Sequence, residues 1–205
     1  MNLIGHENRI KFIDKYDITP ISHQKILDGQ HKEGVSGLLT DRYYCFSYKL
    51  KGDETDKTRT FNCGYSIAED LLELTNQEKL PLFNPFKISD VGKRSDKNNL
   101  RIRKNKKQYD SLALQLSNAI NLIILCYDGN ISGTLAKIKR NIDKYYYSRP
   151  FDYKVKSVNT IINNLFNQKL TDKVCEIIKN QEIKSFDFTL LSEIIKNYKT
   201  TNYFE

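Results

Sequence analysis

The sequence predicts an α+β protein, in which an N-terminal part with short helices and an antiparallel β-hairpin precedes a bundle of about five helices. Over 42–50, Tyr44, Phe46, Tyr48 and Leu50 alternate with Cys45, Ser47 and Lys49, which is the period of a half-buried strand. After residue 110 apolar residues recur at helical spacing instead. A basic stretch separates the two patterns. We therefore expect a mixed part over 1–91, a basic connector over 92–109 and a helical part over 110–205 that can share one core with the first.

The N-terminal segment carries weak helical signals. Apolar residues over 3–16 predict a short, weakly amphipathic helix. Thr19-Pro20 interrupts it, and proline is favoured at the first position of a helix, so a second short helix is expected through Leu27. The polar segment from there to Gly37 is expected to be a loop.

The hairpin is expected over 42–63. A charged turn around Gly52-Asp53 follows the first strand, and 58–63 is the returning strand. A helix is expected over 66–75, with Ser66 and Glu69 as its capping box.

The segment Leu80–Phe86 is apolar and contains two prolines, so it is not expected to be helical. We expect it to pack as an extended strip that covers part of the core.

The helical part opens with the most apolar helix of the chain. Asp110 or Ser111 is expected to cap it, and its apolar residues on most faces mark it as the buried central helix. In the next helix, Tyr145 has the spacing of the core residues and Lys139 that of the exposed face. The expected helices run over 111–125, 134–147, 154–167, from 171 onward, and near 187–198.

The positive charge is concentrated in two clusters. The whole chain has a formal charge of +8, while residues 1–91 are net −2. Residues 92–109 hold eight basic groups and one acidic group, and residues 137–156 hold seven and two. Localised basic charge favours a polyanionic partner.

We therefore expect a nucleic-acid-binding protein without catalytic activity. Its basic clusters, 93–107 and 137–156, would contact phosphates, and tyrosines within the second cluster could stack on unpaired bases. The two clusters form one surface if the helix over 134–147 packs beside the start of the helix at 111. The expected contact residues are Lys93, Arg94, Arg101, Arg103, Lys104, Lys106, Lys107, Lys137, Arg140, Lys144, Tyr147 and Arg149. The type of nucleic acid stays open, and a charged loop beside a solvated helix face would give the same pattern.

Two other functions stay open. A protein-interaction module, either an inhibitor or an adaptor, would dock the basic stretch on an acidic protein and use Leu80–Phe86 as an apolar anchor. A metal-dependent nuclease needs an acid-x-Lys triplet, and Asp152-Tyr-Lys154 and Glu182-Ile-Lys184 have that pattern. Both triplets lie at helix boundaries without a preceding strand, and such triplets arise by chance in a chain that is 28% charged.

Metal, cofactor and location are weakly indicated. His23, His31, Cys45 and Cys63 are of ligand type, but their spacing matches no zinc motif, so buried free cysteines are expected and no metal or cofactor is assigned. The N-terminus has no signal-peptide pattern, which favours a cytoplasmic protein without membrane attachment. Richness in Lys, Asn, Ile and Tyr resembles coding by an AT-rich genome, such as that of a phage or mobile element.

Overall fold

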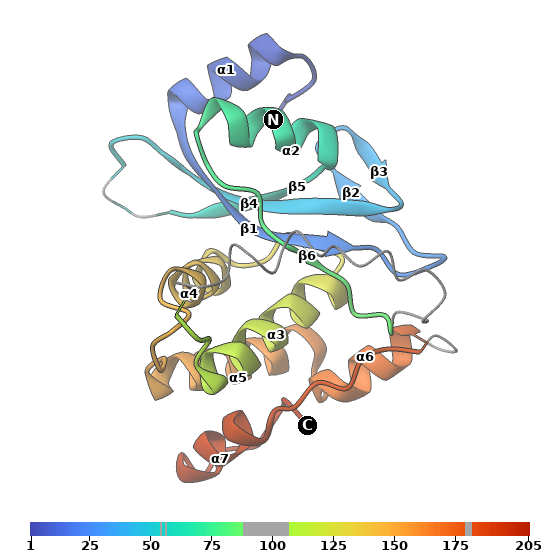
Figure 1. Ribbon diagram of the computed structural model, residues 1–205, viewed down its shortest axis with the longest axis vertical. Coiled ribbons are helices and arrows are strands. Elements are labelled where there is room, and N and C mark those ends of the chain that lie inside the picture. Colours follow the sequence, from blue (N-terminus) through green and yellow to red (C-terminus); the bar gives the residue numbers. More distant parts are fainter. Residues whose placement is uncertain (54, 56, 88–106, 179–181) are drawn as a thin grey trace.

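The computed structural model describes residues 1–53, 55, 57–87, 107–178 and 182–205. A sheet crosses the middle of the molecule, with two helices above it and the helical part below it (Figure 1). The N-terminus lies above the sheet and the C-terminus at the opposite end (Figure 1). The α+β class predicted from the sequence is confirmed.

The main sheet has four strands in the order β5-β4-β1-β6. Neighbours β1–β4 and β4–β5 are antiparallel, whereas β6 runs parallel to β1, with His23 opposite Leu82. A second, two-stranded sheet is formed by β2 and β3. The strands are β1 (Tyr16–Lys25), β2 (Lys32–Gly34), β3 (Gly37–Leu39), β4 (Arg42–Leu50), β5 (Arg59–Gly64) and β6 (Leu82–Phe83).

Helices cover both faces of the main sheet (Figure 1). One face carries α1 (His6–Lys15) and α2 (Tyr65–Leu74). The other face carries the helical part, whose central helix α3 is buried along nearly its whole surface. This part consists of α3 (Ser111–Cys126), α4 (Gly133–Lys144), α5 (Asp152–Phe166), α6 (Leu170–Ile178) and α7 (Thr189–Asn197).

The two faces of the sheet belong to separate cores. The core under α1 and α2 is rich in aromatic residues, such as Phe46 and Phe61. The larger core combines Ile21, Tyr43 and Cys45 of the sheet with the apolar residues of all five C-terminal helices. The mixed and helical parts therefore share one core. Among the described residues, no helix has the length and apolarity to cross a membrane.

Several expected elements are confirmed. β4 spans 42–50 as predicted, and β5 is the returning strand. β4 is buried on both faces rather than half-buried, because Tyr43 and Cys45 pack in the larger core and Tyr44 and Phe46 in the core under α1 and α2. Asp110 caps α3, because its side chain accepts a hydrogen bond from the Ala113 amide at 3.0 Å. The Leu80–Phe86 segment covers the core as an extended strip: β6 lies within it, and Phe86 forms an isolated bridge with Ile183.

The helix expected from Pro20 to Leu27 is wrong, because residues 16–25 form the central strand β1. Helices on both sides of the sheet bury β1 on both faces, so its sequence does not alternate. Buried Ser22 and Gln24 disguise it further, since both pair with Asn121 of α3. Pro20 lies at a register shift between β1 and β4, where a strand tolerates a missing amide.

Two smaller expectations also fail. Ser66 does not cap α2, because the helix begins one residue earlier, at Tyr65, and Gly64 occupies the N-cap without a side-chain hydrogen bond. The segment expected to be a loop up to Gly37 contains β2, which turns into β3. These strands are only three residues long, too short to give a periodic pattern.

Candidate nucleic-acid interface

Helix α4 carries three of the expected contact residues on one side. Lys137, Arg140 and Lys144 fall within about 60° of arc at 100° per residue. Arg140 and Lys144 are exposed, and Lys137 is half-buried. We call these three residues the α4 face. The Arg140 guanidinium also lies 3.5 Å from the Thr19 hydroxyl of β1, so the face borders the sheet.

Two residues of this helix and the turn after it are not where their spacing placed them. Lys139 was expected on the exposed face but is 5% exposed, and its ammonium lies 2.6 Å from the Asp143 carboxylate. Tyr145 was expected in the core but is 43% exposed. The reason is that α4 ends at Lys144, so Tyr145 leaves the helical path.

The described end of the basic connector meets the second cluster. The Lys107 ammonium lies 3.8 Å from the centre of the Tyr147 ring, within cation–π distance. Tyr109 packs on Tyr146, and the Asp110 amide donates to the Tyr146 carbonyl at 2.9 Å. Residues separated by about 40 positions in the sequence are thus brought together beside the end of α4.

The turn between α4 and α5 and the first turn of α5 expose four aromatic rings. Tyr145 and Tyr147 are 43% and 40% exposed, and Phe151 and Tyr153 are 68% and 58% exposed. We call Tyr145, Tyr147, Phe151 and Tyr153 the aromatic corner. The Phe151 and Tyr153 rings are nearly parallel, at 15°, with their centres 5.9 Å apart.

Cations lie beside the rings of the aromatic corner. Lys144 lies 5.3 Å from the centre of the Tyr145 ring. Lys154 lies 5.4 Å from that of Phe151 and 5.9 Å from that of Tyr153. Lys154 is itself buried, and its ammonium donates to the side-chain oxygen of Asn141 in α4. Its position is therefore set by the packing of α5 on α4.

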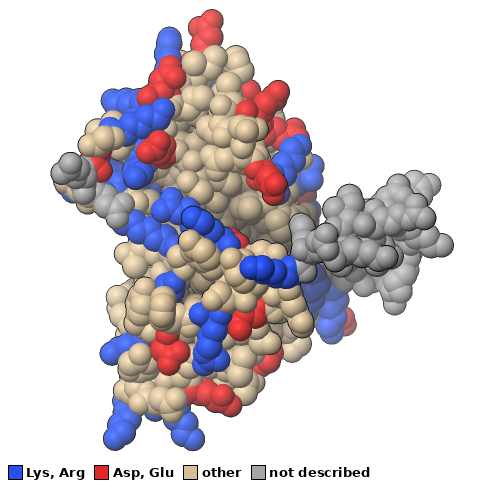
Figure 2. Space-filling model, turned by 60° about the vertical axis from the view of Figure 1, so that its left-hand side comes forward, with Lys and Arg blue, Asp and Glu red and all other residues tan. Residues whose placement is uncertain are grey.

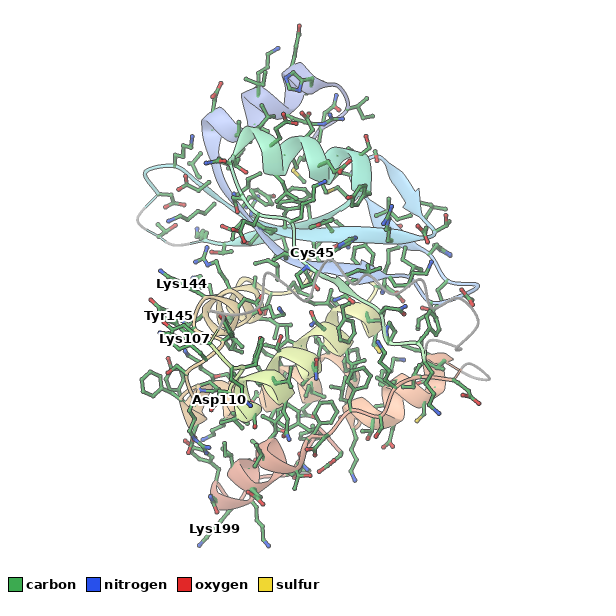
Figure 3. The ribbon with its side chains drawn as sticks, viewed as in Figure 1. Cys45, Lys107, Asp110, Lys144, Tyr145 and Lys199 are labelled. Carbon is green, nitrogen blue, oxygen red and sulfur yellow. The ribbon has the colours of Figure 1, made fainter. Side chains whose placement is uncertain are left out.

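The α4 face and the corner lie on the same side of the molecule. Lys107, Lys144 and Tyr145 project from that side, just below the sheet (Figure 3). Lys and Arg side chains gather there across the middle of the molecule, where the two parts meet (Figure 2). Arg149, also exposed, lies in the turn that carries the corner.

The structure thus brings together six of the expected contact residues, and the other six are outside the described residues. The first group is Lys107, Lys137, Arg140, Lys144, Tyr147 and Arg149. The second group is Lys93, Arg94, Arg101, Arg103, Lys104 and Lys106. Tyr147 is the one aromatic residue among the expected contact residues, and Phe151 and Tyr153 were not among them, although both lie within the basic and aromatic run of the second cluster.

The start of α4 is fixed against the hairpin. A Cβ atom on Gly133 would lie 2.4 Å from the Thr58 carbonyl oxygen, so only glycine allows this approach. Next to this contact, the Thr60 hydroxyl donates a hydrogen bond to the Ile131 carbonyl oxygen at 2.8 Å. Ser132 caps the helix by accepting from the Leu135 amide.

The potential metal ligands do not converge. Cys45 packs in the larger core and Cys63 in the aromatic core, so the sheet separates the two thiols. Burial raises the pKa of Cys45 to about 12 and also raises that of Cys63, which keeps both protonated. Within the described parts of the chain, no group of three or more His, Cys, Asp or Glu side chains could hold a metal ion.

His23 is instead a buried aromatic residue. Its ring stacks on Tyr44 at 4.2 Å, and its Nδ1 lies 3.2 Å from the Leu80 carbonyl oxygen. Among the described residues, its buried Nε2 has no hydrogen-bond partner. Burial lowers the pKa of His23 below its ordinary value of 6.5.

The acidic residues considered for a nuclease lie at unrelated places. Asp152 is the first residue of α5, and Glu182 lies between α6 and α7 beside Lys87, at 3.5 Å. Neither belongs to a strand of the main sheet. The apolar anchor considered for a protein partner is also partly used, because Phe83 and Phe86 pack against the larger core.

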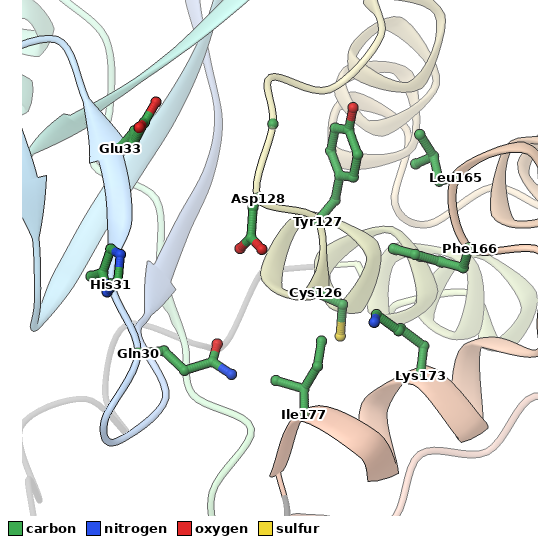
Figure 4. Close-up of a pocket in the computed structure, with 11 residues that line it drawn as sticks. Gln30, His31, Glu33, Cys126, Tyr127, Asp128, Leu165, Phe166, Lys173 and Ile177 are labelled. Carbon is green, nitrogen blue, oxygen red and sulfur yellow. The ribbon is translucent and has the colours of Figure 1, made fainter.

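A cleft of about 720 Å³ lies elsewhere, between the loop before β2 and the ends of α3, α5 and α6. Gln30 and His31 form one wall, and Cys126, Lys173 and Ile177 form the other (Figure 4). Two of its charged groups have protein partners. Asp128 accepts from buried Lys32 at 2.9 Å, and Lys173 lies 3.1 Å from Glu176.

The chain belongs to the family described as "Uncharacterised conserved protein UCP028583", whose model matches residues 1–203. No curated protein and no solved structure matches the chain. The matched range covers nearly the whole chain.

Proposed function

We propose that the chain is a nucleic-acid-binding protein that contacts phosphates through the α4 face, Lys107 and Arg149, without catalysing a reaction. The observation that carries this proposal is the contact of Lys107 with Tyr147, because it joins the end of the first basic cluster to the second. The connector residues expected to bind phosphate, from Lys93 to Lys106, lead directly into this contact in the sequence.

Charge and exposure support the proposal. Arg140 and Lys144 of the α4 face are exposed, as is Arg149 in the turn that follows, whereas residues 1–91 are net acidic. Arginine and lysine in this arrangement attract a polyanion over a distance and bind its phosphates on contact. The acidic residue within α4, Asp143, is engaged with Lys139 and does not cancel the face.

The proposal includes a cytoplasmic location. The four cysteines are free, and three of them are buried. Free thiols are typical of a reducing compartment. An origin in a phage or mobile element stays part of the proposal on compositional grounds alone.

Salt dependence is the direct test. Affinity for a fluorescent oligonucleotide should fall about 100-fold between about 50 and 200 mM salt if five phosphates of a single strand are contacted. The triple variant Arg140→Glu/Lys144→Glu/Arg149→Glu should bind more weakly and reduce the slope of log affinity against log salt by about two.

A control variant makes the same change in net charge elsewhere. Lys11, Lys169 and Lys199 are exposed and lie on α1, before α6 and after α7, respectively. Lys199 lies at the far end of the molecule from Lys144 (Figure 3). Reversing these three charges should change affinity much less than the first variant. Equal losses in both variants, or an affinity that does not change with salt, would contradict the proposal.

A further inference from the structure

We infer that the aromatic corner binds unpaired bases, so that the preferred ligand is a single-stranded rather than a duplex nucleic acid. This inference rests on the proposed function and adds the class of ligand. It depends on the geometry of the exposed rings, which phosphate binding alone does not require.

The rings of the aromatic corner are exposed and adjacent. Phe151 and Tyr153 are among the most exposed large apolar residues of the described chain, and they lie next to each other rather than scattered. Exposed apolar residues that cluster indicate a binding surface, whereas single ones need no explanation. Tyr145 and Tyr147 extend the cluster along the same turn.

The cations beside the rings identify the class of partner. Two exposed lysines, Lys107 and Lys144, each lie within 6 Å of a ring centre in the corner. An apolar protein partner would have to bury these charges, and that costs free energy unless each charge is paired. A nucleic acid matches both features, because its bases stack on the rings and its phosphates pair with the cations.

The single-stranded form follows from where bases are accessible. In a duplex the faces of the bases are stacked on one another and only their edges line the grooves. In an unpaired strand each face is free to stack on a tyrosine or phenylalanine. The nearly parallel Phe151–Tyr153 pair thus offers a flat surface that an unpaired base can cover.

The test compares short unstructured strands, both RNA and DNA, with duplexes of the same length in a fluorescence anisotropy titration. The wild-type chain should bind the single strands more tightly than the duplexes. Phe151→Leu/Tyr153→Leu should weaken single-strand binding by at least about fivefold for each ring that stacks on a base. Duplex binding should change less than twofold.

Ring-preserving variants serve as the matched control. Phe151→Tyr and Tyr153→Phe keep a flat ring at each position and should bind like the wild type. If the leucine variant also binds single strands like the wild type, the inference is wrong.

A spectroscopic variant reports stacking directly. The chain contains no tryptophan, so Phe151→Trp introduces a single indole fluorophore. Saturation with a single strand should quench its emission, and saturation with a duplex should leave the emission nearly unchanged. An emission that no single strand alters at saturation would also overturn the inference.

The two proposals fail in different ways. If the charge-reversal variant loses binding while the leucine variant does not, phosphate binding stands and base stacking is excluded. If no oligonucleotide binds the wild-type chain at low salt, the proposed function itself is wrong.

Discussion

The chain holds two groups of aromatic residues in opposite environments. Around β4 and β5, neighbouring aromatic rings pack with their centres 5.5–5.8 Å apart; these rings are those of Phe12, Phe46, Tyr48 and Phe61. Phe46 is fully buried. In the aromatic corner, each ring is at least 40% exposed and lies within 6 Å of a lysine ammonium.

The buried rings stabilise the fold, whereas the exposed rings are available to a ligand. Burial of a phenylalanine contributes about 1.5–3 kcal/mol to folding, so the rings of the hairpin hold α1 and α2 on the sheet. The rings of the corner gain little of this free energy. Their exposed apolar surface is of the kind that a bound ligand covers.

The largest expected effect is on stability. Phe46→Ala should lower the free energy of unfolding by about 3–5 kcal/mol, because it leaves a cavity between Phe61 and Tyr44. Phe151→Ala should change it by less than about 0.5 kcal/mol. Urea unfolding measures the free energy of unfolding of both variants. Similar decreases in the two variants would show that the buried and the exposed rings do not differ in their contribution to stability.

An intermediate effect is expected at the junction that supports the corner. Asp110→Ala removes the hydrogen bond to the Ala113 amide and should lower the free energy of unfolding by about 1 kcal/mol. Asp110→Ser keeps a capping oxygen and should recover most of it. Equal stability of the alanine variant and the wild type in urea would show that the cap does not stabilise α3.

The smallest effect is expected at His23, whose ring is buried against Tyr44. Its pKa is lower in the folded chain than the ordinary 6.5, so the unfolded chain binds the proton more readily. Stability from this residue is complete above about pH 6.5 and is lost as the pH falls through the folded value. Urea midpoints should therefore fall between pH 7 and 5 by less in His23→Gln than in the wild type. Identical pH dependence would show that His23 does not titrate on unfolding.

Much of the fold could be predicted from periodicity. β4 was recognised because Tyr44, Phe46 and Tyr48, which pack in the core under α1 and α2, recur at every second position. The helices after α3 have apolar spacing because each buries one side. The central strand β1 could not be recognised, because both its faces are buried and its polar Ser22 and Gln24 pair with a residue 97–99 positions away. The sequence pattern around β1 does not indicate a partner so far away in the chain.

The site could be predicted only in part. The two charge clusters were visible as runs of lysine and arginine, and their meeting at Lys107 and Tyr147 was a condition that the sequence could state but not test. The exposure of Phe151 and the burial of Lys139 depend on where α4 ends and how α5 crosses it. Both are results of packing, which the residue types alone do not determine.

Because Gly133 packs closely against Thr58, a small change in the angle of α4 at this contact would be magnified along the helix. The helix contacts the hairpin at Gly133, and Lys144 lies about 16 Å along the axis from that point. A tilt of 10° at Gly133 would therefore displace the far end by about 3 Å. A small side chain introduced at this glycine, remote from any ligand, would misalign the cations and rings at the other end of the helix.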